Sequence, residues 1–252
     1  MNAKRNYQNS HNPNFTGVEQ LNVTEQFLSR YSRNIVKLII KGLQVSNIRE
    51  GHDYSLLEFG AGTGFLADLL KEDFGLKPDC VELDPNLQQL ITSKGFICEQ
   101  HIADLNRKYD AVYTSNVLEH ILDDLGALVE LHGVLKPRGV MVVYVPAHPF
   151  LFSKMDEEIG HVRRYTKREL QRKVETAGFT IQAVNYDDFL GYFISMIVRF
   201  AGYGKKGIGS PQSLRIYDNL IFPISRFFDL VGMRFVIGKN LYLVATKSPI
   251  EK

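Results

Sequence analysis

Three segments of the chain carry side chains that could move a proton, and each lies beside an apolar run. They are the pair Glu119–His120, the histidine His148, and a polar loop that holds Asp156 and His161. Histidine titrates near neutral pH, so His161 and His148 are candidate general bases, with Asp156 as a third candidate. The acids and histidines from 148 to 161 show no recognised metal-ligand spacing, so we expect no metal.

The polar loop is the densest of the three segments. Arg163, Arg164 and Tyr165 follow His161 closely, and three acids precede it. An arginine can bind a carboxylate or phosphate through two parallel hydrogen bonds, so these three residues are candidate substrate ligands. A charge run of this kind is also typical of a solvated salt-bridge cluster, which is the alternative interpretation.

A glycine-rich turn lies upstream, between the apolar run Leu56–Phe59 and an amphipathic segment that begins at Phe65. Its glycines, Gly60, Gly62 and Gly64, let backbone amides approach a ligand where a Cβ would interfere. Their spacing is G-x-G-x-G rather than the G-x-G-x-x-G of dinucleotide sites, which favours S-adenosylmethionine over a nicotinamide or flavin. The alternative is a tight turn that uses glycine for geometry alone.

The elements that must position these residues alternate along the chain. Apolar runs predict strands at about 54–59, 79–82, 96–101, 110–115, 139–145, 180–186 and 240–246, with helices between most of them. Thr166 and Glu169 form a capping box that predicts a helix ending near Ala177, before Gly178. This order predicts a doubly wound α/β fold with a mostly parallel sheet.

In their order, these blocks resemble the class I S-adenosylmethionine-dependent methyltransferases over roughly residues 50–187 and the last strand. The resemblance implies a Rossmann-like, seven-stranded sheet with an antiparallel last strand, helices on both faces, and the methyl donor across its C-terminal edge. Gly160–His161 and Arg163–Tyr165 resemble a motif of bacterial methyltransferases associated with surface-glycan or lipid pathways. The implied cofactor-binding residues are Glu58, Gly60, Ala61, Gly62, Gly64, Glu82, Leu83, Asp104, Asn116 and Val117.

Three of these residues have roles that follow from their chemistry. Glu58 could accept from the donor's ammonium group, or it is a solvated acid at a strand end. Glu82 follows the glycines by about twenty residues and offers two oxygens to the ribose hydroxyls. Asp104 either accepts from the adenine amino group or only forms a turn.

Four segments are expected. Residues 1–45 form an N-terminal arm whose helix begins near Thr24 and packs on the sheet, or covers the donor with Tyr31 or Arg33 near it. Residues 46–187 form the donor-binding core, 188–239 a helical insertion over the acceptor, and 240–252 the last strand and tail. The insertion's aromatics and its cations suit either internal packing or an anionic membrane surface. Those cations are Arg199, Lys205, Lys206, Arg215, Arg226, Arg234 and Lys239.

Composition narrows the setting. The chain has 252 residues, 44% of them hydrophobic, enough for one α/β domain with an elaboration, and its formal charge of +2 gives no general nucleic-acid footprint. Cys80 and Cys98 are expected to be core thiols of a reducing compartment, and we recognise no secretory signal. We therefore expect a cytoplasmic protein, with peripheral contact at the inner membrane face as an option and no obligate protein partner.

The expected function is transfer of a methyl group from S-adenosylmethionine to an oxygen or nitrogen of a small-molecule, glycan or lipid-linked acceptor. Two alternatives stay open. One is an isoprenoid-quinone O-methyltransferase, and the other is a catalytically silent subunit that still binds the donor.

Overall fold

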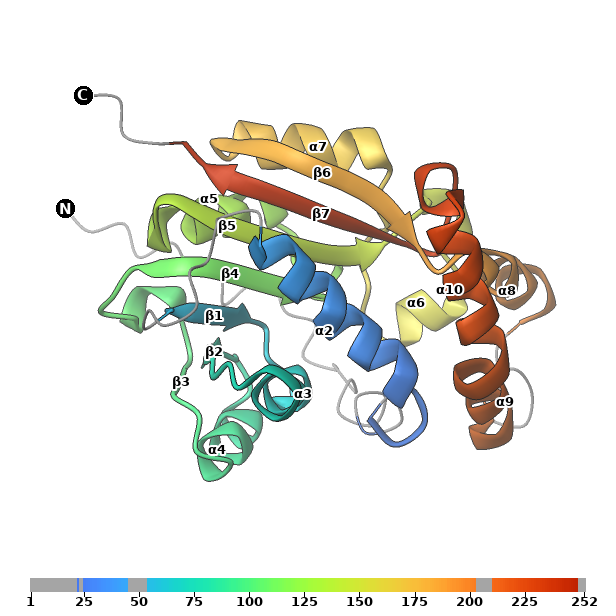
Figure 1. Cartoon of the computed structure of the whole chain (residues 1–252), viewed down its shortest axis with the longest axis horizontal. Coiled ribbons are helices and arrows are strands. Elements are labelled where there is room, and N and C mark those ends of the chain that lie inside the picture. The colour runs from blue at the N-terminus through green and yellow to red at the C-terminus, as the bar shows by residue number, and fades with distance from the viewer. Residues whose placement is uncertain (1–21, 23–24, 45–53, 203–209, 249–252) are drawn as a thin grey trace.

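A computed structural model describes residues 22, 25–44, 54–202 and 210–248. Within them lies one sheet in the order β3-β2-β1-β4-β5-β7-β6 (Figure 1). Neighbours from β3 to β5 pair in parallel, whereas β7 is antiparallel to both β5 and β6. The predicted fold class and the antiparallel last strand are therefore confirmed. The strands are β1 Leu56–Phe59, β2 Asp79–Val81, β3 Cys98–Glu99, β4 Tyr109–Ser115, β5 Leu135–Pro146, β6 Phe179–Asp187 and β7 Asn240–Lys247.

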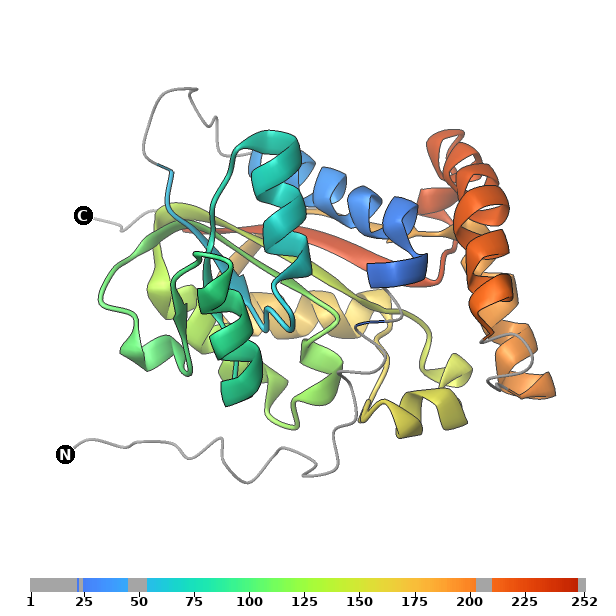
Figure 2. The same cartoon turned by 90° about the horizontal axis from the view of Figure 1, so that it is seen from below.

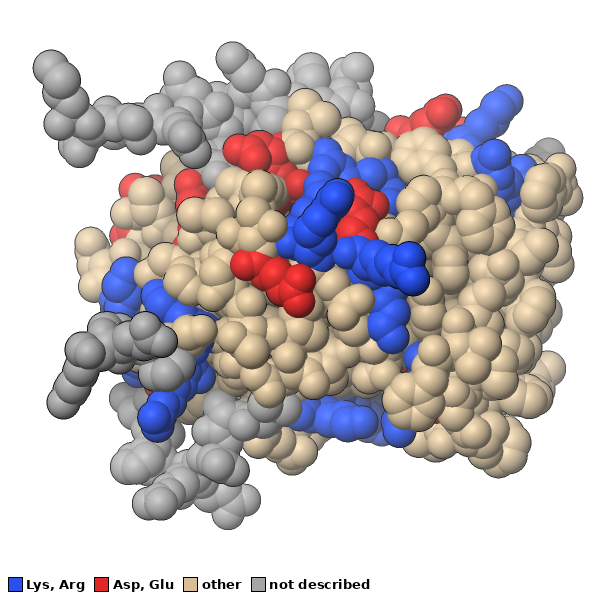
Figure 3. Space-filling model, turned by 90° about the horizontal axis from the view of Figure 1, so that it is seen from above, with Lys and Arg blue, Asp and Glu red and all other residues tan. Residues whose placement is uncertain are grey.

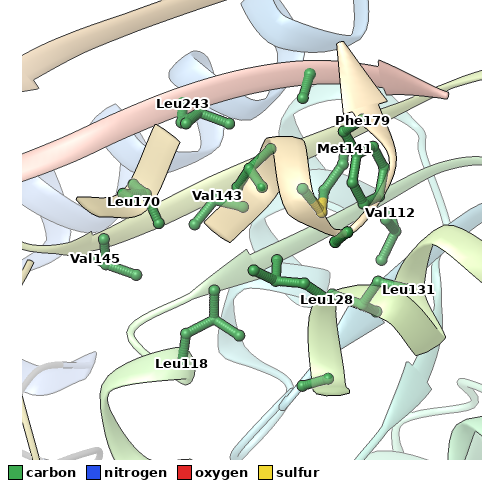
Figure 4. Packing of buried hydrophobic residues seen from close by; sticks show 14 of the residues in the cluster. Val112, Leu118, Leu128, Leu131, Met141, Val143, Val145, Leu170, Phe179 and Leu243 are labelled. Atoms are coloured by element: carbon green, nitrogen blue, oxygen red, sulfur yellow. The ribbon is translucent and has the colours of Figure 1, made fainter. Parts of the chain in front are cut away.

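The central strands carry buried apolar runs, such as Val140–Val145 of β5, because helices cover both faces of the sheet. Successive residues point to opposite faces, so Val112 packs under α5 and α7 while Tyr113 packs under α2 and α3. Figure 4 shows the first of these layers, and Figure 2 shows α2 and α3 on the other side of the sheet from α7. The helices on the sheet are α2 Ser29–Leu43, α3 Phe65–Phe74, α4 Pro85–Ser93, α5 Asp124–Val134 and α7 Lys167–Thr176.

The predicted start of α7 is confirmed, with the first of the two hydrogen bonds of a capping box. The Thr166 side chain accepts from the Glu169 backbone N–H, and Gly178 follows the helix with a φ of 96°. Strand ends were less predictable: β5 begins at Leu135 rather than near 139, because Leu135 pairs with Tyr109 ahead of a register shift. Cys80 and Cys98 are neighbours on β2 and β3 and are both free thiols.

Helix α2 packs on the sheet, as the first of its two interpretations expects. A Cβ on Gly42 would lie only 2.6 Å from Val142 Cγ2, so helix and sheet are in close contact. Tyr31 is buried against Tyr144, and Arg33 pairs with Asp73 of α3. Thr24, the expected start of the helix, lies outside the described residues.

The described part of the insertion consists mainly of helices. It contains α8 Phe189–Ala201, α9 Pro211–Ile216, the π-helical turn Tyr217–Ile221, α10 Phe222–Leu230 and the 3-10 turn Met233–Phe235. These helices stand at the end of the sheet where the parallel strands finish (Figure 1). Lys205 and Lys206 lie outside the described residues. Among the described helices, none has both the length and the apolar character needed to cross a bilayer.

Two of the insertion's cations contact other parts of the chain, as the internal-packing interpretation expects. Arg226 Nη1 lies 2.5 Å from Asp187 Oδ1 and 3.1 Å from Asp229 Oδ2. Lys239 lies over the rings of Tyr31 and Tyr217, and burial lowers its pKa. Both contacts tie the insertion to the rest of the fold, and membrane contact by the insertion stays a prediction.

Candidate active site

The glycine turn follows β1 and contacts the end of β2 and the loop after β4. Gly60, Gly62 and Gly64 have φ angles of 75°, 57° and 76°, a region that side-chain-bearing residues seldom adopt. The backbone N–H groups of Gly60 and Ala61 donate to Val81 O at 2.9 and 3.0 Å. A Cβ on Gly60 would lie 2.5 Å from Val117 Cγ2. The turn is therefore held between the end of β2 and the loop that follows β4.

Glu82 stands beside this turn, as expected of a ribose-binding acid. Its Oε2 accepts from the Gly62 N–H at 2.7 Å, and its Oε1 accepts from the Asp84 N–H at 3.1 Å. Burial raises the pKa of Glu82, and these two backbone donors act against that rise. Each carboxylate oxygen can accept more than one hydrogen bond, so both retain capacity for a diol. Leu83 follows it and is half-buried.

Glu58 is a buried carboxyl, not the solvated strand-end acid of the alternative interpretation. Only 3% of it is exposed, and Oε2 has no hydrogen-bond partner among the described residues. Burial raises its pKa to about 8. A buried carboxyl oxygen without a partner is costly to a protein, and a cationic ligand would relieve that cost.

This burial predicts how Glu58→Gln changes stability with pH. The pKa of Glu58 is higher in the folded state than in the unfolded state, so protonation of this carboxyl stabilises the fold. This stabilisation is fully present below the unfolded-state pKa and is lost as the pH rises toward 8. We expect Glu58→Gln, which stays neutral, to gain stability over the wild type from pH 5 to pH 8. The difference in unfolding free energy between the variant and the wild type grows by about 1.4 kcal/mol per pH unit. This slope holds over the range in which the carboxyl is ionised in the unfolded state only.

Thermal melts across that pH range measure this difference. Glu72→Gln is the matched control, because the Glu72 side chain is 64% exposed. A constant offset between Glu58→Gln and the wild type at every pH would contradict the raised pKa.

The other implied donor contacts lie on exposed or half-buried loops. Asp104 ends the 3-10 turn Ile102–Asp104 and is exposed, so its adenine contact stays a prediction. Asn116 is exposed with a φ of 54°, and Val117 packs on the glycine turn. One contact was not predicted from the sequence. Thr63 Oγ1 donates a hydrogen bond to the Glu25 carboxylate, which places the segment before α2 against the glycine turn. The arm therefore contacts the glycine turn, and its role as a cover of the donor stays a prediction.

A second polar centre is formed by the 3-10 turn Leu118–His120 and the polar loop after α6 (Lys154–Glu158). His161 Nδ1 lies 2.8 Å from Asp156 Oδ1, and His161 Nε2 lies 3.7 Å from Glu119 Oε1. The two segments are joined by the Val162 N–H, which donates to Glu119 O at 2.8 Å. We call Glu119, His120 and His161 the Glu-His-His centre.

The pKa values of the Glu119 and Asp156 carboxyls are shifted in opposite directions. Glu119 is fully buried, and burial raises its pKa to about 7. Burial also acts to raise the pKa of Asp156, but hydrogen bonds from His161 and Arg164 hold it well below its usual range. An ionised carboxylate on Nδ1 fixes the tautomer of His161 and points Nε2 toward Glu119. Asp156 therefore has the geometry of a positioning residue.

His120 completes the centre. Its ring meets the His161 ring edge-on with centroids 4.6 Å apart, and its Nδ1 lies 3.2 Å from Gly160 O. One potential ligand atom from each of Glu119, His120 and His161 lies within 4.8 Å of the other two. Residue spacing could not reveal this set, because 119–120 and 161 meet only in the fold.

The remaining candidates face internal partners. His148 Nε2 lies 3.0 Å from Gly238 O, the ring stacks on Tyr186, and burial lowers its pKa. Arg164 makes two hydrogen bonds to Asp156 at 2.8 and 3.0 Å. These contacts give His148 and Arg164 structural roles, and a part for either in catalysis or substrate binding stays a prediction.

Arg163 and Tyr165 converge on another carboxylate. Arg163 Nη1 and Tyr165 Oη lie 2.8 and 2.7 Å from Asp124 Oδ2. Tyr165 is 0% exposed and Arg164 is 8% exposed, so the polar loop is not the solvated cluster of the alternative interpretation. The side chains of Arg163, Arg164 and Tyr165 bind carboxylates of the chain itself, which does not support substrate contact. Their role as substrate ligands stays a prediction.

Comparison with known proteins agrees with this geometry. The family model described as "Methyltransferase domain" matches residues 23–184. The chain is 24% identical over 177 residues to a malonyl-[acyl-carrier protein] O-methyltransferase of Ilyobacter polytropus, covering 64% of this chain and 65% of that one. It is 29% identical over 147 residues to a probable S-adenosylmethionine-dependent methyltransferase of Mycolicibacterium smegmatis, covering 55% and 54%. The matches thus span less than two thirds of these relatives.

Among solved structures, one assigned to a sarcosine dimethylglycine methyltransferase of Galdieria sulphuraria superposes with a TM-score of 0.58. Sequence identity is 17%, and the alignment covers 85% of this chain and 84% of that one, which shows a shared fold. With the family match over residues 23–184, which is more than half of its length, the chain belongs to the methyltransferase domain family.

Proposed function

We propose that this chain binds S-adenosylmethionine at the glycine turn and transfers its methyl group to an oxygen or nitrogen of a lipid-linked or otherwise amphiphilic acceptor. The observation that carries the donor half is the pairing of Glu82 with the Gly62 N–H beside a buried, unpaired Glu58 oxygen. Glu82 binds the ribose and Glu58 receives the ammonium group, while the turn passes under the amino-acid portion.

The Glu-His-His centre serves the acceptor. It follows β4 in the same loop that presses Val117 against the glycine turn, so it lies on the side of the sheet where the donor's reactive end is expected. Methyl transfer is an in-line displacement that demands mainly positioning, with a proton acceptor where the nucleophile is a hydroxyl. The centre supplies a buried carboxyl and two partly buried imidazoles for that task.

The apolar character of the acceptor is inferred from the insertion. Its helices expose Phe200, Phe227 and Leu230 at 76%, 61% and 66%. The right-hand side of Figure 3, over these helices, is largely without charged side chains. Exposed aromatics beside scattered cations such as Arg199 and Arg215 suit the anionic face of a membrane in which an amphiphilic acceptor would be presented.

Transfer of labelled methyl tests the function as a whole. The purified chain with labelled S-adenosylmethionine and a cell lipid extract should yield a labelled lipid-phase product, whose mass identifies the acceptor atom and class. A labelled quinone ring would instead support the isoprenoid-quinone alternative. Donor binding with no transfer to lipid or aqueous extracts would favour the silent subunit.

The double substitution Phe227→Ser, Leu230→Ser tests the apolar surface. We expect it to reduce co-sedimentation with phosphatidylglycerol-containing vesicles by at least about tenfold, because each buried side chain of this size contributes roughly 1.5–3 kcal/mol. Ile97→Ser, Val129→Ser is the matched control, since these side chains are 55% and 50% exposed outside the insertion. A wild-type protein that ignores the vesicles would remove the membrane part of the proposal.

A further inference from the structure

We propose that Glu119, His120 and His161 bind a divalent first-row transition-metal ion beside the donor site. Two imidazoles and one carboxylate are a ligand set found in protein sites for zinc and iron. Each of the three residues offers one potential ligand atom, and these three atoms lie within 4.8 Å of one another. The set joins two segments that the chain brings together only through its fold.

The orientation of His161 is the first argument. Asp156 Oδ1 lies 2.8 Å from its Nδ1, so Nδ1 donates to this carboxylate and Nε2 faces Glu119. A carboxylate on the far nitrogen is the usual outer partner of a metal-binding histidine, because it fixes the tautomer and strengthens the ligand. Asp156 is itself held by Arg164 and by the Ser153 N–H.

His120 repeats this arrangement with a backbone partner. Its Nδ1 lies 3.2 Å from the carbonyl oxygen of Gly160, which orients the ring next to His161. A backbone carbonyl is the other common outer partner of metal-binding histidines. The two neighbouring imidazoles thus have the same kind of support on the same ring atom.

Glu119 supplies the independent observation. It is 0% exposed, and neither carboxylate oxygen has a hydrogen-bond partner among the described residues. Its Oε1 lies 3.7 Å from His161 Nε2, which is longer than a hydrogen bond. Two ligand atoms on a tetrahedral ion, each about 2.0–2.1 Å from it, lie about 3.4 Å apart. The observed separation leaves room for an ion between Glu119 and His161 after a small contraction.

The role of the ion rests on the proposed function, whereas its binding does not. A cation there would coordinate an acceptor hydroxyl and lower its pKa, so that the proton passes to solvent as the alkoxide forms. The alkoxide oxygen then forms the new O–CH₃ bond while the S–CH₃ bond breaks, and the donor leaves as neutral S-adenosylhomocysteine. His161 acts as a ligand in this scheme, and the ion replaces a general base.

Titration of the chelator-stripped full chain with Zn²⁺ by calorimetry, and with Co²⁺ by visible absorption, tests the site directly. We expect one ion per chain. Glu119→Gln and His161→Gln should each weaken binding by at least about 100-fold, because loss of an outer partner alone costs roughly 10–100-fold. His132→Gln is the matched control, since this histidine packs on Phe179 away from the centre and should leave affinity unchanged.

Donor binding, measured separately by calorimetry, and circular dichroism complete the design. Folded Glu119→Gln that binds Zn²⁺ as tightly as the wild type, or a wild type that binds no ion, overturns the metal site. If S-adenosylmethionine still binds in that case, the proposed function survives with His161 as proton acceptor. If the wild type binds the ion but neither binds nor uses S-adenosylmethionine, the proposed function fails and the metal site stands.

Discussion

Gly62→Val should abolish binding of S-adenosylmethionine, with no heat detected in calorimetric titration of a folded protein. Gly62 has a φ of 57°, which a β-branched residue adopts only at high cost, and its N–H positions the Glu82 carboxylate at 2.7 Å. Valine would move that N–H, and its side chain would stand where the donor must approach the backbone. The position of the Glu82 carboxylate and the backbone conformation of the glycine turn would both change.

Gly75→Val separates this effect from backbone strain alone. Gly75 has a φ of 68° at the end of α3, with nothing within 4 Å of the position of a Cβ. We expect a similar strain on folding, seen in thermal melts, but unchanged donor affinity. Undiminished affinity in Gly62→Val, with the circular dichroism of the wild type, would exclude the glycine turn as the donor site.

His161→Ala should lower turnover by roughly 10²–10⁴ while donor affinity stays near that of the wild type. The imidazole is held between Asp156 and Glu119, whereas the proposed donor contacts come from the glycine turn and Glu82. Its loss therefore removes activation of the acceptor, by metal or by proton transfer, and spares the donor. Steady-state rates with the acceptor identified by labelling, together with calorimetry for the donor, measure the two effects.

His132→Ala is the control for the loss of an imidazole elsewhere in the core, and it should retain turnover. A fall in rate that saturating acceptor restores would show that His161 positions the acceptor without activating it. Equal turnover in His161→Ala and the wild type would return the Glu-His-His centre to a structural role.

The donor half of the site could be predicted from the sequence because its information is local. A strand, three alternating glycines and a helix follow one another within a dozen residues, and positive φ is a property of the glycines themselves. Glu82 was predictable because β2 must lie beside β1, which places the end of one strand against the turn after the other. The N-cap of α7 at Thr166 is local in the same way.

Burial and contacts between distant segments could not be predicted from the sequence. Whether Glu58 is solvated or buried follows from the helices that cover both faces of the sheet. Arg164, Tyr165, Arg226 and Lys239 look like surface groups in the sequence, yet each meets a partner from another element. The Glu-His-His centre is the clearest case, because residue types reveal ligands only when their spacing is short. The fold alone brings the turn after β4 against the loop after α6.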